Sequence, residues 1–166
     1  VLASVLPHSD PLHKVTILPR GMALGVTWTL PEERHTYSKE YFEDVICKAM
    51  GGRVAEMIVF GHLNSGAAND LEQATSIMVR EWGMSTEVGP MAWSGQQQVF
   101  LGEDLMTSGR EYSDETAKMI DGEIARILRE QEDRARDLLT KHRRGLDLVA
   151  LRLLEEETID GQAVGR

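Results

Sequence analysis

The sequence has few of the features that mark secreted, membrane-spanning or nucleic-acid-binding proteins. Its one cysteine, Cys47, excludes an intrachain disulfide and favours a reducing compartment. No apolar run approaches the roughly 18 residues that a membrane-spanning helix needs. Only 18 Lys and Arg face 27 Asp and Glu, so no basic surplus is available to bind phosphates. We therefore expect an acidic, soluble domain without a nucleic-acid partner.

The chain is long enough for a single domain with a real core. Its 166 residues are 42% hydrophobic, which allows a sizeable buried interior. Near the N-terminus, the β-branched run Val15–Leu18 predicts a strand, and Leu24–Leu30 predicts a second strand after the Pro19–Gly21 turn. Together they predict one small sheet.

A long helical segment is predicted after Ser38, a residue that can cap a helix start. Apolar residues beyond it recur at helical spacing, and Cys47 falls among them, so we expect a buried thiol rather than a nucleophile. The pair Gly51 and Gly52 interrupts this face, which predicts close backbone packing. Gly61 is expected to end the helix.

The last third of the chain predicts two amphipathic helices. Ser113 precedes an apolar stripe that extends from Ala117 to Leu138, and a second stripe extends from Leu146 to Leu154. We expect the two helices to pack as an antiparallel hairpin. The predicted fold is mainly α with a small β-sheet, in one domain spanning residues 1–166.

The stretch N-S-G-A-A-N-D-L-E-Q-A-T, Asn64–Thr75, places a small-residue turn before a helix start. Asp70 lies in the first turn of that helix, where the helix dipole favours a negative charge. A carboxylate held in this way is a suitable ligand for a metal ion. The residue types alone also allow an ordinary helix-terminus charge.

Histidine and tryptophan give no independent signal of a site. The five histidines share no metal-like spacing on one helix, so we expect structural or exposed roles for His8, His13, His35, His62 and His142. The three tryptophans are expected in the core rather than on a binding surface: Trp28, Trp82 and Trp93.

Five separated motifs occur in one order along nearly the whole chain. They are H-K-V-T-I-L-P-R-G at His13–Gly21, L-G-V-T-W-T-L-P at Leu24–Pro31, G-G-R-V-A-E at Gly51–Glu56, S-G-A-A-N-D-L ending at Leu71, and E-W-G-M-S at Glu81–Ser85. This succession resembles the protease domain of the FtsH family, which comprises membrane-anchored AAA+ ATP-dependent zinc metalloproteases. Chains of that family usually have about three more residues between the positions of Thr75 and Met78.

The resemblance implies a catalytic zinc ion held by three protein ligands and a water. In the family two histidines and the general-base glutamate come from H-E-x-x-H, which is absent here and is expected upstream of Val1. Asp70 takes the position of the third ligand. Glu56 is the alternative candidate for the third ligand. If Asp70 is the ligand, Glu56 is expected either to orient a ligating histidine or to be an ordinary charge on the helix surface.

The second predicted strand also acquires a role from the resemblance. Zinc proteases of this architecture hold an extended peptide against an edge strand through main-chain hydrogen bonds, which suits unfolded polypeptide substrates of any sequence. The residues expected to form this substrate strand are Gly25, Val26, Thr27, Trp28, Thr29 and Leu30.

The resemblance predicts the C-terminal proteolytic domain of an FtsH-like zinc metalloendopeptidase that degrades unfolded or membrane proteins. It implies a homohexamer, an upstream AAA+ domain in the same chain, and a membrane-anchored parent with this domain on the cytoplasmic or organelle matrix or stromal side. No G-x-x-x-x-G-K-[ST] loop occurs here, so ATP belongs to the ATPase domain. The alternative is a non-catalytic pseudo-protease module that serves hexamer assembly. Without H-E-x-x-H, the chain alone is expected to be inactive.

Overall fold

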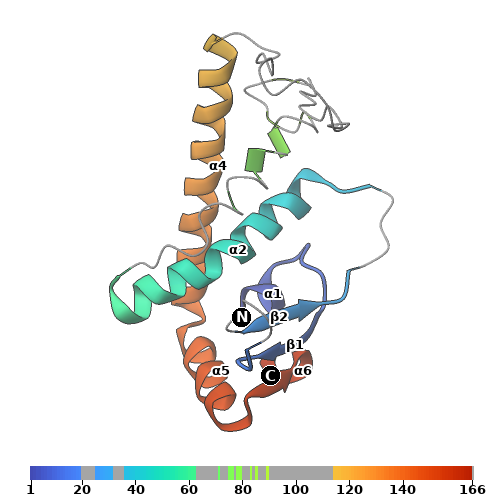
Figure 1. Cartoon of the computed structure of the whole chain (residues 1–166), viewed down its shortest axis with the longest axis vertical. Helices are drawn as coiled ribbons and strands as arrows, with labels where there is room; N and C mark the ends of the chain where they lie inside the picture. Colours follow the sequence, from blue (N-terminus) through green and yellow to red (C-terminus); the bar gives the residue numbers. More distant parts are fainter. Residues whose placement is uncertain are drawn as a thin grey trace, which may run out of the picture. The chain divides into compact units, whose positions relative to one another are not determined.

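The computed structural model describes residues 1–19, 25–31, 36–62, 71, 75–76, 78–79, 83, 85, 89 and 114–165. The elements are α1 (Leu2–Val5), β1 (Leu12–Thr16), β2 (Val26–Thr29), α2 (Lys39–Phe60), α4 (Asp114–Lys141), α5 (Arg143–Glu156), β3 (Thr158–Asp160) and α6 (Gly161–Val164), shown in Figure 1. The predicted mainly helical fold with a small sheet is confirmed.

The chain divides into two compact units, which we describe separately. The first contains Val1–Ala67 and Glu130–Arg166, and the second contains Ala68–Arg129. The sheet, α2 and α5 all belong to the first unit. The single domain expected over residues 1–166 stays a prediction, because this division does not test it.

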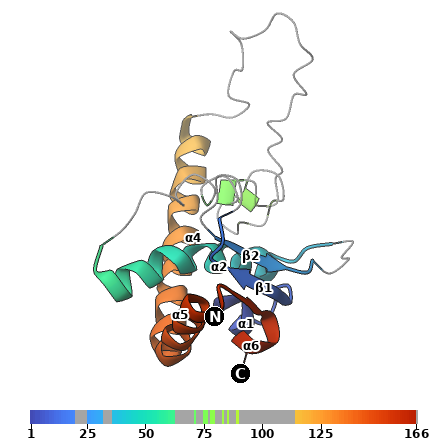
Figure 2. The ribbon, with the colours of Figure 1, turned by 60° about the horizontal axis from the view of Figure 1, so that its bottom comes forward.

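The sheet has three antiparallel strands in the order β2-β1-β3, so β1 is central and β2 lies at an edge. Figure 2 shows β2 beside β1. Val15 of β1 is paired with Thr27 on one side and with Ile159 on the other. Directly paired residues have side chains on the same face of a sheet. Ile159, Val15 and Thr27 therefore form one row across all three strands.

The predicted strand limits were wrong at both ends of β1. That strand begins at Leu12 and ends at Thr16 rather than extending to Leu18. β3 was not predicted at all. Its three residues are too few to show an alternating pattern, and only Ile159 is buried. The strand is held by β1 and by the Thr158 hydroxyl, which donates to the Thr16 hydroxyl oxygen at 2.8 Å.

Helix α2 has the start and end that its sequence predicts. The Ser38 side chain accepts a hydrogen bond from the Tyr41 N–H at 3.2 Å, and Gly61 ends the helix in the left-handed region at φ 74°. Cys47 is fully buried, as predicted. Gly51 confirms the expected close packing, because a Cβ atom there would lie 2.7 Å from Leu2 Cδ1. At Gly52 the same expectation was wrong: an added Cβ would meet no atom within 4 Å.

Helices α4 and α5 occur where predicted, but they do not form an antiparallel hairpin. Only His142 separates them. Its N–H donates to the Leu138 carbonyl at 2.9 Å, and its own carbonyl accepts from the Leu146 N–H at 3.1 Å. Both are helical hydrogen bonds, and a reversal needs a loop of about two to five residues. Helix α5 therefore continues onward from the end of α4, as Figure 1 shows.

The second unit has its own apolar interior. Its described buried residues come from helical positions near the middle of the chain and from the first part of α4: Leu71, Met78, Val79, Ile120, Ile124 and Ile127. The Thr75 hydroxyl donates to the Leu71 carbonyl at 2.8 Å, which satisfies a fully buried polar group.

Candidate functional site

Strand β2 has one paired edge and one edge that no described strand covers. The Leu30 N–H donates to the Pro11 carbonyl at 2.9 Å, so the main-chain groups of Leu30 point toward β1. These groups alternate in direction along a strand, so those of Trp28 and Val26 also point toward β1. The N–H and C=O of Thr27 therefore point toward the open edge.

The two faces of β2 differ in their surroundings. Trp28 lies on the face opposite to Thr27, with the Lys14 ammonium 3.9 Å from its ring centroid. With 36% of its surface exposed, Trp28 is not the core residue that the sequence predicted. Its indole lies instead beside an amphipathic lysine, in a cation–π contact. Trp82 and Trp93 lie outside the described residues.

A pocket of about 270 Å³ lies on the Thr27 face of the sheet. Its walls come from α1, β2, α2 and the ends of α4 and α5 that meet at His142, and they include Leu2, Thr27, Gly52, Leu139 and Leu146. The lining is mostly apolar. Lys48 is its one charged side chain, and among the described residues the Lys48 ammonium makes no ion pair.

Glu56 lies on α2 one helical turn beyond Gly52, so the two positions share a side of the helix. Its side chain is half-buried, and within the described part of the chain it makes neither a hydrogen bond nor an ion pair. A half-buried carboxylate without a protein partner is available to orient another group. The structure thus places Glu56 on α2, one helical turn from Gly52 in the pocket wall.

The predicted metal ligand Asp70 lies outside the described residues. Among the residues that the structure does describe, no group of three or more His, Cys, Asp or Glu side chains could hold a metal ion. His13 and His62 are exposed, as expected. The role of Asp70 stays a prediction.

None of the described helices is long and apolar enough to cross a membrane.

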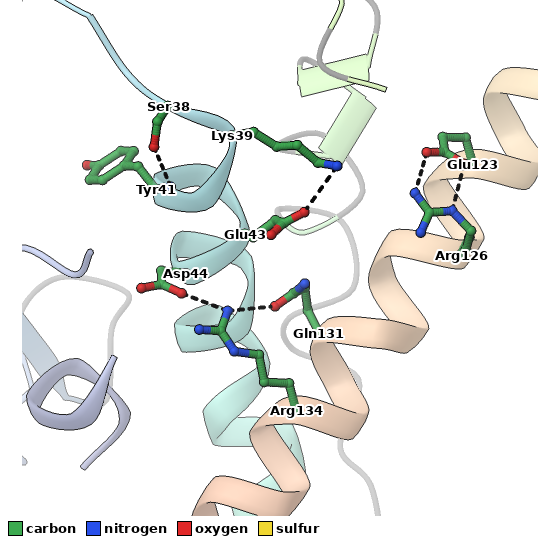
Figure 3. Close-up of polar contacts among 9 residues, drawn as sticks. All are labelled: Ser38, Lys39, Tyr41, Glu43, Asp44, Glu123, Arg126, Gln131 and Arg134. Atoms are coloured by element: carbon green, nitrogen blue, oxygen red, sulfur yellow. Dashed lines mark hydrogen bonds and ion pairs between the residues drawn. The ribbon is translucent and has the colours of Figure 1, made fainter. Parts of the chain in front are cut away.

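Asp44 is a buried carboxylate that sequence reasoning missed. It is 1% exposed and lies on α2 (Figure 3). It accepts the His8 main-chain N–H at 2.8 Å, and Arg134 Nη1 lies 2.7 Å from its other oxygen. The same arginine donates to the buried Gln131 side chain at 3.3 Å. These contacts tie α2 to the segment after α1 and to α4, which makes Asp44 an anchor of the fold.

The chain is similar throughout its length to known proteases. Residues 1–166 match the model of peptidase family M41. The ATP-dependent zinc metalloprotease FtsH of Acidimicrobium ferrooxidans is 62% identical over 170 residues, which cover 100% of this chain. Proteins of the same name from Pelobacter propionicus and Thermotoga maritima are 49% and 44% identical, over 99% and 100% of the chain.

The matched region is only part of each relative. It makes up 26% of the Acidimicrobium ferrooxidans protein, 27% of the Pelobacter propionicus protein and 28% of the Thermotoga maritima protein. This chain therefore spans about a quarter of the length of the relatives that it matches.

Proposed function

Because this chain belongs to peptidase family M41, we propose that it is the proteolytic domain of an ATP-dependent zinc metalloendopeptidase that degrades unfolded or membrane proteins. The match over all 166 residues is the observation that carries this proposal. The relatives are named zinc metalloproteases, so zinc is the metal that the family uses. ATP would serve an ATPase domain elsewhere in the same protein, and the parent would be membrane-anchored.

Asp70 is the residue we propose as the third protein ligand of the zinc ion, with two histidines supplied from a segment before Val1. A zinc ion bound in this way activates a water molecule and polarises the scissile carbonyl. The described residues alone form no metal-binding group, which agrees with donors that lie outside the described part of the protein, Asp70 among them. Glu56, whose carboxylate on α2 has no partner among the described residues, would orient one of the ligating histidines.

Strand β2 is the proposed substrate strand. No described strand covers its outer edge, and the N–H and C=O of Thr27 point toward that edge. A peptide residue opposite Thr27 can exchange two main-chain hydrogen bonds with it, whatever its side chain. Such binding suits an enzyme that acts on unfolded chains of many sequences.

The ligand assignment is tested by comparing Asp70→Asn with Glu56→Gln in the full-length protein. Asp70→Asn removes the charge of a ligand and nearly preserves its shape, so zinc content and casein hydrolysis should fall together. Glu56→Gln should reduce them less, by about 10-fold to 100-fold, as for partners of metal ligands in general. Metal content is measured by mass spectrometry, and the isolated 166-residue chain serves as a zinc-free control.

Three outcomes of this experiment are informative. Full zinc occupancy in Asp70→Asn with complete loss in Glu56→Gln would make Glu56 the third ligand. Loss in both variants to the same degree would show that the two carboxylates act together. A full-length protein that binds no zinc and cleaves no casein would favour the alternative, a non-catalytic module that serves assembly.

A further inference from the structure

We propose that Lys14 and Trp28 make one position of the bound peptide selective for an acidic side chain and against a basic one. The inference rests on the proposed function, because it takes β2 as the substrate strand. It adds a charge preference on the face of the sheet opposite to Thr27, and it names the two residues of this chain that set this preference.

A row of three paired residues directs a cation toward the outer edge of β2. Trp28 is paired with Lys14, and Lys14 is paired on its other side with Asp160. Opposite charges in paired positions ordinarily attract each other. The Asp160 side chain instead caps α6, where it accepts the Ala163 N–H at 2.8 Å. Lys14 makes no ion pair within the described part of the chain, and its ammonium lies 3.9 Å from the centroid of the Trp28 ring.

A peptide residue opposite Trp28 would extend this row by one position. The main-chain groups of Trp28 point toward β1, so in an antiparallel peptide this residue forms a pair without mutual hydrogen bonds, in which side chains lie closest together. Neighbouring strands are about 4.8 Å apart, so the peptide main chain would lie about 10 Å from β1. Lys14 covers part of that distance over the indole, and a glutamate side chain of the peptide can cover the rest.

The indole and the ammonium together define which side chain fits. The exposed ring offers an apolar surface to the methylene groups of the peptide side chain, and the ammonium offers the opposite charge to its carboxylate. A lysine at this position of the peptide would meet a like charge. Because the chain has a net charge of −9, a cation beside the substrate strand also opposes the repulsion that an acidic peptide meets elsewhere on the surface.

The test measures kcat/KM of the full-length protein on uncharged peptides that carry glutamate, glutamine or lysine at one position. Scanning this position along the peptide with the wild type finds the residue that lies opposite Trp28. There the glutamate peptide should be cleaved about 2-fold to 5-fold better than the glutamine peptide, as for an exposed ion pair, and the lysine peptide should be cleaved worse. Ionic strength of about 1 M should largely remove the difference, because the Debye length is then about 3 Å.

Three variants assign the preference to its residue. Lys14→Met removes the charge and keeps an unbranched side chain, so the glutamate and glutamine peptides should be cleaved equally well; Lys14→Gln is the second uncharged variant in case the first fails to fold. Lys14→Arg keeps a cation that stacks on aromatic rings and should keep the preference. Lys48→Met is the matched control, because it removes the same charge on the Thr27 side of the sheet and should leave the preference at this position unchanged.

The outcomes separate this inference from the proposed function. A glutamate preference that survives in the uncharged variants of Lys14 overturns the inference and leaves the proposed function intact. A wild type that cleaves the peptides without such a preference at any scanned position does the same. Equal loss of the preference in Lys48→Met would assign it to the net charge of the protein and also overturns the inference. A wild type that cleaves no peptide overturns the proposed function itself.

Discussion

At the scale of single residues, Asp44 is a buried carboxylate whose charge is satisfied by two distant segments of the chain. A buried carboxylate is stable only when hydrogen bonds and an opposite charge replace its water. Asp44 has both, from the His8 N–H and from Arg134. Arg134 itself is 36% exposed, so the two partners of this ion pair differ strongly in their access to water.

This asymmetry predicts that removing Arg134 costs more than neutralising Asp44. Arg134→Met leaves the buried carboxylate without its arginine partner and should lower the free energy of unfolding by about 3–5 kcal/mol. Asp44→Asn keeps an acceptor for the His8 N–H and leaves an arginine that water can reach, so it should cost about 1–3 kcal/mol. Urea unfolding of both variants and the wild type measures the difference. A larger cost for Asp44→Asn would contradict this account.

Cys47 predicts a loss of stability in alkaline solution. Burial raises the pKa of its thiol from about 9 to about 11; the nearby Asp44 also raises it, and Arg134 opposes them by lowering it. The folded chain thus favours the neutral thiol, a contribution that is complete below pH 9 and is lost as the pH rises toward 11. The loss should reach about 2–3 kcal/mol.

The measurement is the free energy of unfolding as a function of pH in the wild type and in Cys47→Ala. The wild type should lose more stability than the variant between pH 9 and pH 11. Thiol-specific reagents should also react slowly with the folded protein at pH 8, because the thiolate is the reactive form. Parallel pH profiles in the two proteins would show that folding does not raise the pKa of Cys47, and would contradict this prediction.

Local sequence signals correctly predicted the structural roles that depend on neighbouring residues. Ser38, Cys47 and Gly61 have the roles of cap, buried hydrophobe and helix end that neighbouring residues indicate. Asp44 was missed because its partners lie far away in the chain, at His8 and Arg134. The pair Gly51 and Gly52 also gives no sign in the sequence of which glycine is closely packed against another residue and which has open space at its Cβ position.

At the scale of elements, the sequence predicted helices better than their arrangement. The apolar stripes of α4 and α5 are visible in the sequence, but the single residue His142 between them excludes the expected reversal. The three-residue strand β3 has too little pattern to be predicted and depends on pairing with β1 across most of the chain. The edge strand β2 was expected and is present, within narrower limits of Val26–Thr29.

The direction of the main-chain groups in β2 predicts unequal effects of proline. Thr27→Pro removes an N–H that points toward the open edge, where proline is tolerated. Cleavage of unfolded substrates should fall about 10-fold, and folding and zinc content should be kept. Val26→Pro and Trp28→Pro remove donors toward β1 instead and should destabilise the sheet.

The readouts are peptide cleavage, zinc content and thermal unfolding of the full-length variants. Thr27→Val is the control for the side chain, because it keeps the main-chain N–H and nearly the same shape. Full activity in Thr27→Pro would place the substrate on another part of the protein. A melting temperature that falls equally in all three proline variants would contradict the assigned direction of the groups.

At the scale of the whole molecule, five sequence motifs predicted the family. The complete set of zinc ligands could not be identified from this sequence. Asp70 lies outside the described residues, and the histidines of the family motif do not occur as H-E-x-x-H in this sequence. The match to the Acidimicrobium ferrooxidans protein covers 170 residues against 166 here, so that relative has additional residues within the matched region. The expected gap between Thr75 and Met78 is one candidate for their place, and it stays a prediction.

The surface of α5 predicts where copies of the chain meet. No residue of this helix is buried, and three of its leucines are more than half exposed: Leu148, Leu151 and Leu154. Spacings of three residues place these leucines on one side of the helix. An apolar stripe of this kind is stabilised when it is covered, and the hexamer proposed from the family resemblance offers neighbouring copies to cover it.

We therefore expect Leu151→Lys and Leu154→Lys together to weaken assembly, because charged side chains would have to be buried at the contact. Light scattering at micromolar concentration should show a six-membered ring for the wild type and smaller species for the double variant. Met119→Lys on α4 is the control, since Met119 is half exposed and lies on a different helix. Equal disruption by Met119→Lys would show that added charge alone weakens assembly, wherever it is placed. Intact rings in the leucine variant would assign the contact to another surface, and a wild-type chain that is monomeric would show that assembly depends on the ATPase part of the protein.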